Sequence, residues 1–297
     1  MAPPPIHPSS QASSGSWIDG ILQGDLPDFP AFLARVEASV LVRPYVVLAF
    51  YFLLVSAGEL ATVLGVASFA VWGNGLALVL LCAHGALLME GNHARLGRFL
   101  VALMPIPLVR IVSLTSPQMQ FSFVVWMGLV GIILYGGIFS ALRFLKPSRA
   151  SVGLQLPDRR HLALEVGVVL AGFLFGAVEY LILRPGPIMV SPSFQDVVVM
   201  AVVLYVSTGV LEELLFRGLL QHYGAEALGA VPAMVLVTGL FAVLHAGWHS
   251  WLDIAFVAAV GGFYAWVVHR TRSILGVSLS HGITNCMLFI GMPLLWP

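Results

Sequence analysis

Long apolar segments, separated by short polar stretches, run along almost the whole chain from residue 45 onward. Because a helix needs about 20 apolar residues to cross a bilayer, each segment of that length predicts one membrane-spanning helix. The segments are 45–70, 75–91, 96–114, 121–144, 162–183, 196–221, 231–247, 252–269 and 274–295. They predict an all-α, polytopic bundle of about nine transmembrane helices. Eight is the alternative, because the first two segments are the weakest candidates.

The first 44 residues follow a different pattern. Residues 1–16 are rich in proline and serine and have no basic stretch, so we expect a disordered segment and not a signal peptide. Apolar positions at helical spacing between Phe29 and Leu41 predict a short helix on the membrane interface. We therefore divide the chain into a tail (1–44), four N-terminal membrane helices of unassigned role (45–145) and a membrane core (146–297).

Basic residues gather in alternate loops. They precede the first segment, follow the second, and are most numerous in the loop 145–161, which contains Pro147 and Pro157; the opposite loops hold only Arg184. Cytoplasmic loops carry the excess of arginine and lysine. We expect the N-terminus to be cytoplasmic and the C-terminus to lie outside.

The composition agrees with a membrane protein. Of the 297 residues, 59% are hydrophobic and 9% are charged, whereas soluble domains are about 25% charged. A net charge of zero gives no basic footprint for nucleic acid. Only one of the 14 basic residues is a lysine, and alanine, glycine and proline are abundant. This bias is typical of GC-rich bacteria, so we expect the bacterial inner membrane.

The first cluster of polar residues lies within the sixth apolar segment. Glu212, Glu213 and Arg217 lie there within six residues, although each charge near the bilayer centre costs about 2.5–3.5 kcal/mol on insertion scales. Glu213 and Arg217 are four residues apart, in the order that favours a helical ion pair. Glu212 points about 100° away. Glu213 and Arg217 are therefore interpreted as a structural pair and Glu212 as the free carboxylate; one stabilising network of all three is the alternative.

A second cluster, Phe241 and His245, occupies one face of the seventh segment. Counting from the turn that joins the two segments, with the sixth ending near Gly224, Glu212 and His245 lie about 18 and 22 Å along their helices. They should therefore reach a similar depth. A carboxylate and an imidazole at one depth can share and deprotonate a water molecule.

A third cluster, His281 and Asn285, shares one face of the ninth segment. An imidazole N–H and an amide NH₂ that converge could stabilise an oxyanion. The alternative is that they hydrogen-bond neighbouring helices together. His249, four residues after His245, makes only a weak metal-binding pattern.

Other polar or small residues in the apolar segments suggest structural roles. Interfacial or structural positions are expected for Glu59, Glu90, Glu165 and Glu179, and close helix packing for Gly261 and Gly262. The sequence suggests no partner for His84, Arg110 or Cys286, and Cys82 and Cys286 form no disulfide framework or metal-ligand spacing.

The three clusters in this order resemble the three motifs of the CPBP family, which comprises CAAX proteases and bacteriocin-processing enzymes, over residues 160–297. The resemblance implies a membrane-embedded glutamic endopeptidase that uses no metal and acts on a membrane-associated peptide or protein at the lipid bilayer. It implies that Glu212 and His245 activate water and that His281 and Asn285 form an oxyanion hole. Glu213, Arg217 and Phe241 would then be supporting residues.

Three alternatives remain. A zinc-dependent membrane protease would use Glu212, His245 and His281 as ligands. A proton-coupled transporter would also bury Glu and His, although no inverted repeat is visible. A non-catalytic immunity or scaffold protein is the third alternative.

Overall fold

The computed structural model describes residues 39–116, 121–189 and 192–296, and every regular element within them is helical. The chain divides into two compact units, Met1–Arg43 and Pro44–Pro297. Of the first unit only residues 39–43 are described, with a short 3₁₀ helix, η1 (Val40–Val42). The expected disordered segment (1–16) and most of the helix expected at 29–41 lie outside the described residues.

Nine helices in the described part of the second unit are long and apolar enough to cross a membrane, which confirms the predicted number. They are Pro44–Val63 (α3), Ala67–Leu87 (α4), Gly91–Thr115 (η2, α5 and α6), Phe123–Leu145 (α7), Arg159–Leu183 (η4 and α8), Phe194–Leu228 (α9 to α11), Ala230–Trp248 (α12 and η7), Trp251–Thr271 (α13) and Leu275–Leu295 (α14, η8 and α15).

Two of the predicted boundaries were wrong. The first two helices are separated at residues 64–66 and not at 70–75; the turn there is built by Gly65 with φ +75°, between apolar neighbours that hydropathy cannot distinguish from the helices. The sixth helix runs on to Leu228, beyond the expected end near Gly224. It stops where Gly229 takes φ +89°, a conformation that favours glycine.

The third membrane segment is divided in two, as its prolines indicate. Helix α5 (Ala94–Leu103) is followed by α6 (Pro105–Thr115), with Met104 between them. Proline is tolerated in the first turn of a helix because the N–H it lacks would have no partner there. Pro105 therefore begins α6, which carries Arg110.

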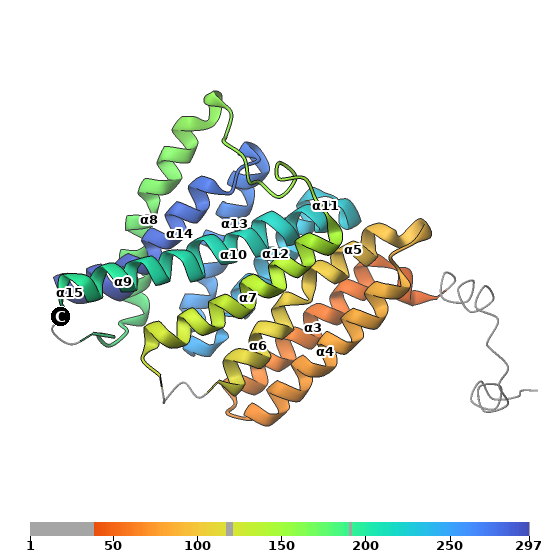
Figure 1. Ribbon diagram of the computed structural model, residues 1–297, viewed down its shortest axis with the longest axis horizontal. Helices are drawn as coiled ribbons and strands as arrows, with labels where there is room; N and C mark the ends of the chain where they lie inside the picture. Colours follow the sequence, from red (N-terminus) through yellow and green to blue (C-terminus); the bar gives the residue numbers. More distant parts are fainter. Residues whose placement is uncertain (1–38, 117–120, 190–191, 297) are drawn as a thin grey trace, which may run out of the picture. The chain divides into compact units, whose positions relative to one another are not determined.

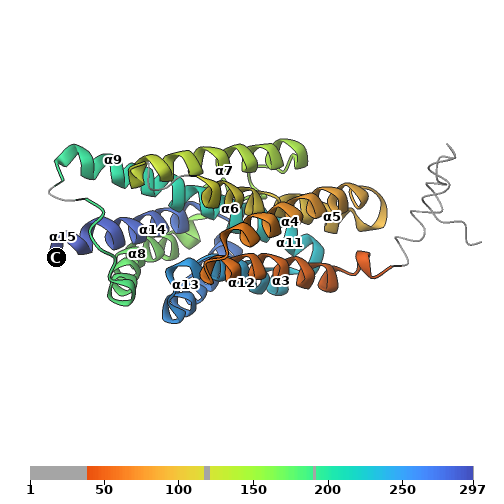
Figure 2. The same ribbon diagram turned by 90° about the horizontal axis from the view of Figure 1, so that it is seen from below.

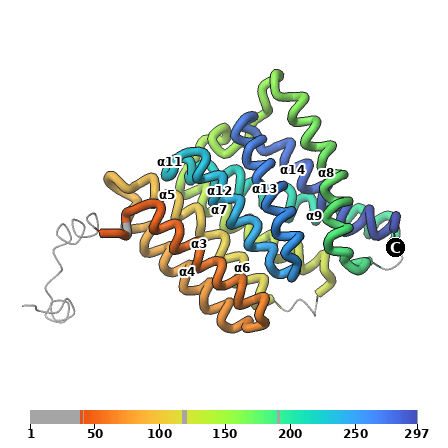
Figure 3. Tube along the Cα trace, turned by 180° about the vertical axis from the view of Figure 1, so that it is seen from behind, coloured from red at the N-terminus to blue at the C-terminus, as the bar shows by residue number. Residues whose placement is uncertain are grey.

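The sixth membrane segment is a central element of the second unit and contacts α3, α5, α7, α12, α13 and α14. In Figure 1 it runs as one continuous helix through α9 (Phe194–Leu204), α10 (Leu211–Glu213) and α11 (Gln221–Leu228), and α7 lies beside it. Figure 2 shows α7 and α9 in one layer. Figure 3, from behind, shows α12 (Ala230–Val243) and α13 between α3 and α8 (Leu162–Leu183).

A close helix crossing brings α14 (Leu275–Cys286) against the sixth segment. A side chain at Gly209 would lie 2.7 Å from the backbone nitrogen of Gly282, and one at Gly282 would overlap the ring of Tyr205. Small residues let membrane helices approach in this way. On its other side α14 packs against α8, whose Glu165 accepts a hydrogen bond from the Gly276 N–H at 2.9 Å. That contact stabilises the start of α14 and gives Glu165 the expected structural role.

Candidate active site

Glu212 and Glu213 lie where the sixth membrane segment departs from regular α-helix. The three-residue α10 is flanked by two π-helical stretches, η5 (Tyr205–Val210) and η6 (Leu214–Leu220). Side chains bond to carbonyls in and beside η5: the Tyr135 hydroxyl donates to Val206 at 2.9 Å and the Thr208 hydroxyl to Leu204 at 2.5 Å. π-Helical turns are rare and frequently mark functional sites.

Glu213 is the centre of a buried polar network. Its Oε1 accepts a hydrogen bond from Arg217 Nη1 at 2.8 Å and another from His281 Nδ1 at 2.8 Å. The side chains of Glu213 and Arg217 are both fully buried. The predicted pairing of Glu213 with Arg217 is therefore confirmed, and His281 of α14 joins it.

The Arg217 guanidinium makes two further contacts, a hydrogen bond to a backbone carbonyl and a stacking contact with an aromatic ring. Nη2 donates to the Gly261 carbonyl at 3.1 Å, and the guanidinium carbon lies 4.3 Å from the centre of the Phe241 ring. This stacking is a cation–π contact, which gains strength away from water. A side chain at Gly261 would approach Nη2 to 2.9 Å, so the bare backbone of α13 leaves the room that Arg217 occupies.

Glu212 points away from this network and into a cavity. Its side chain is 27% exposed, and it lines a cavity of about 290 Å³ together with Phe241 and His245. That volume is near the lower end of the range for ligand pockets, about 300–1,000 Å³. Glu212 and His245, which come from different membrane segments, therefore face the same cavity.

His245 lies just beyond the end of its helix and not on it as predicted, but its ring lies on the same side as that of Phe241, with the ring centres 4.8 Å apart. Helix α12 ends at Val243, and His245 has φ −90° and ψ 0°. Its Nδ1 lies 2.9 Å from the Phe241 carbonyl oxygen. A carbonyl can only accept, so Nδ1 carries the proton and Nε2 of the neutral ring is an acceptor. The ring is thus held in the tautomer that can take up a proton at Nε2.

His281 and Asn285 lie one turn apart on α14, outside the residues that line the cavity. His281 Nε2 is 4.0 Å from Glu212 Oε2, too far for a direct hydrogen bond, while its Nδ1 is bonded to Glu213. Asn285 Nδ2 donates to Thr208 Oγ1 at 2.7 Å. His281 is therefore bonded to Glu213 and lies near Glu212, and the Asn285 amide links α14 to η5.

Arg110 is a wall residue of this cavity for which the sequence suggested no partner. Its Nε and Nη2 bond to the two carboxylate oxygens of Glu59 at 2.5 and 2.6 Å. The pair joins α6 to α3 across 51 residues of sequence, so no local spacing could reveal it. Two opposite charges within apolar segments were the available signal. Helices α6 and α7 supply much of the cavity wall. The N-terminal helices therefore form part of the candidate active site.

Within the described residues, no three His, Cys, Asp or Glu side chains are grouped so that they could hold a metal ion. His249 follows the end of the helix, is exposed and has φ +55°.

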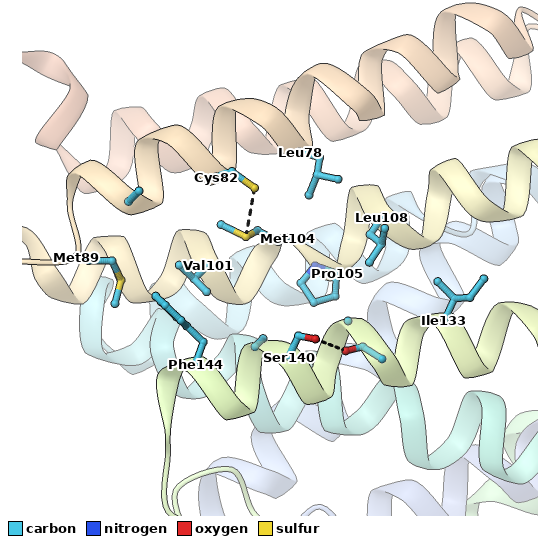
Figure 4. A pocket seen from close by; sticks show the side chains of 14 residues that line it. Leu78, Cys82, Met89, Val101, Met104, Pro105, Leu108, Ile133, Ser140 and Phe144 are labelled. Atoms are coloured by element: carbon cyan, nitrogen blue, oxygen red, sulfur yellow. Dashed lines mark hydrogen bonds between the residues drawn. The ribbon is translucent and has the colours of Figure 1, made fainter.

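A larger cavity of about 790 Å³ lies between α4, α5, α6 and α7, and none of the candidate residues line it. Figure 4 shows its wall, where Cys82 Sγ lies 3.8 Å from Met104 Sδ.

Comparison with known proteins gives one family. The model for type II CAAX prenyl endopeptidase, Rce1-like, matches residues 194–287, a range that contains both glutamates, Arg217, Phe241, His245, His281 and Asn285. No curated protein and no solved structure gives a significant match. Over residues 194–287, about a third of the chain, the protein is thus similar to the Rce1-like type II CAAX prenyl endopeptidases.

Proposed function

We propose that the protein is a glutamic endopeptidase that processes or sorts a membrane-associated peptide or protein. The observation that carries the proposal is the shared cavity of Glu212 and His245, beside the fully buried pair of Glu213 and Arg217. Two adjacent glutamates thus differ in environment. Glu212 is exposed to a cavity that could admit water and substrate, whereas Glu213 is hydrogen-bonded to buried side chains.

In the proposed reaction, a water molecule lies between the Glu212 carboxylate and the Nε2 atom of His245. One of these groups takes a proton as the water oxygen attacks the scissile carbonyl carbon. The carbonyl oxygen becomes an oxyanion. As the C–N bond breaks, the proton passes to the departing amine, and the second product carries the new carboxylate.

The supporting residues would hold these groups in place. Glu213 positions His281, whose Nε2 faces Glu212 at 4.0 Å, and the Phe241 carbonyl sets the tautomer of His245. We propose that His281 and Asn285 donate hydrogen bonds to the oxyanion. Since Asn285 is bonded to Thr208, its amide would exchange that bond for the developing oxyanion, which is worth more in a low-dielectric site.

The experiment that tests the proposal compares wild-type protein with Glu212→Gln, purified in lipid, in single-turnover cleavage of substrates identified from membrane fractions by their new termini. Glu212→Gln keeps the side-chain shape and should abolish cleavage. Glu226→Gln, on the same membrane segment and outside the cavity lining, is the matched control and should cleave normally. Activity that survives strong chelators would contradict the zinc-dependent alternative, and near-normal cleavage by Glu212→Gln would contradict the glutamic mechanism.

A further inference from the structure

A second buried ion pair faces the candidate active site from the N-terminal helices. Glu59 of α3 is 1% exposed, whereas Arg110 of α6 is 19% exposed. Arg110 is also part of the cavity wall that contains Glu212 and His245. The carboxylate thus lies behind the guanidinium, and the guanidinium lies between the carboxylate and the cavity.

The pairing leaves one edge of Arg110 for another group. Glu59 engages Nε and Nη2, while Nη1 has only the Ser113 hydroxyl at 3.5 Å, the outer limit of a hydrogen bond. A guanidinium has five N–H donors in a planar fork. Glu59 therefore fixes the plane of the fork and leaves the Nη1 donors without a strong acceptor.

Stability alone is a weak reason for this arrangement. A buried ion pair is often no more stabilising than apolar side chains of similar size, and ionisable groups inside a membrane usually mark functional sites. The pair lies outside residues 194–287, which match the family, so what it does is particular to the N-terminal helices.

We propose that Arg110 is a specificity-determining residue that binds the C-terminal carboxylate of the substrate, so that the enzyme cuts near the end of a chain. This inference rests on the proposed function. The acceptor would form charge-assisted hydrogen bonds with the Nη1 edge, the geometry for which arginine is better suited than lysine.

The character of the cavity favours a carboxylate over a neutral group. Most of its wall is apolar; the polar lining side chains besides Arg110, Glu212 and His245 are Ser113, Ser207 and the indoles of Trp126 and Trp248. A carboxylate that enters such a space needs a cation, and among the described residues that line the cavity Arg110 is the only arginine. Because Glu59 already offsets part of the charge, we expect a preference of about tenfold, in the range of one charge-assisted hydrogen bond.

The test uses two forms of one dansyl-labelled peptide that ends in farnesyl-cysteine followed by three aliphatic residues. One form has a C-terminal carboxylate and the other a C-terminal amide. Binding is measured by fluorescence anisotropy to full-length Glu212→Gln protein in lipid nanodiscs. The carboxylate form should bind about tenfold more tightly. Adding Glu59→Gln and Arg110→Gln together, which leaves no unpaired buried charge, should remove this preference.

The matched control is the pair Arg98→Gln and Glu226→Gln, which removes another Arg–Glu bridge between helices, 3.1 Å long and absent from the cavity lining. It should keep the preference. Equal binding of both peptides, binding of neither, or a preference that survives Glu59→Gln/Arg110→Gln would overturn the role of Arg110.

Cleavage of the same peptides by wild-type protein separates the two proposals. Equal cleavage of carboxylate and amide forms would leave the proposed function standing and overturn the inference. Preferential binding of the carboxylate form without cleavage of either peptide would support the carboxylate-binding role of Arg110 and contradict the proposed peptidase function.

Discussion

Arg217 and Glu213 form a hydrogen-bonded ion pair 2.8 Å long, and neither side chain is exposed. Glu213 lies between the two π-helical stretches, Arg217 lies within the second of them, and Glu213 also holds His281. The pair therefore connects the packing of α14 against the sixth membrane segment to the orientation of the imidazole nearest Glu212. A change in this pair should affect folding before it affects chemistry.

The ion pair gives the first prediction. Glu213→Ala or Arg217→Ala leaves one buried charge without its partner, so each should lower the free energy of unfolding by about 3–5 kcal/mol. The double variant removes both charges and should lose less than the sum of the two single losses. Unfolding by denaturant in mixed micelles measures all three. Strict additivity would show that the two residues do not stabilise each other.

Gly261 gives a second prediction, with its neighbour as the control. A methyl group at Gly261 would lie 2.9 Å from Arg217 Nη2 and 3.1 Å from the Phe241 ring, whereas one at Gly262 would meet Thr238 at an ordinary 3.7 Å. Gly261→Ala should destabilise the protein by about 1–3 kcal/mol, and Gly262→Ala should be neutral or slightly stabilising. Thermal unfolding in one lipid mixture compares them. Equal changes in stability for the two variants would mean that the Arg217 side chain shifts to make room for the added methyl group without destabilising the protein.

Local patterns predicted the helices and the Glu213–Arg217 pair well. Apolar length gave the nine spans, and the i, i+4 spacing gave the ion pair. The misplaced boundaries lie where apolar residues form the turn, as at Gly65, or continue a helix beyond its expected end, as at Leu228. Hydropathy measures transfer into lipid and does not register such changes in backbone direction.

What the sequence could not supply are contacts between distant segments. The partner of Arg110 is 51 residues away, and the Asn285 amide meets Thr208 across 77 residues. Which helices line a cavity also depends on packing angles that no local pattern encodes. The part played by α6 and α7 in the cavity wall therefore had to come from the structure.

The third prediction concerns Asn285. If its amide stabilises the oxyanion, Asn285→Ala should lower turnover by about 10²–10³ and leave substrate binding nearly unchanged. Thr208→Val is the matched control, because it removes the hydrogen-bond partner of Asn285 and keeps the amide itself. Single-turnover cleavage and equilibrium binding are compared. Loss of folded protein in Asn285→Ala would assign the residue to helix packing.

The fourth prediction concerns orientation in the membrane. The excess of basic residues in the loop 145–161 predicts that this loop is cytoplasmic, and nine spans then place the C-terminus outside. Reporter fusions at residue 155 and at the C-terminus should give opposite signals. The same signal at both positions would require an even number of spans between them and would contradict the orientation.

The fifth prediction separates a catalytic pair from two independent residues. Glu212 and His245 line one cavity, and in the proposed mechanism they act on one water molecule. Glu212→Gln and His245→Ala should each reduce single-turnover cleavage severely, and the double variant should be scarcely slower than the worse single variant, because a group that acts as a unit is lost with its first member. His249→Ala, which changes an exposed imidazole after the helix end, should cleave normally. If the two effects instead multiply, Glu212 and His245 serve separate steps, and a single water held between them is the wrong description of the site.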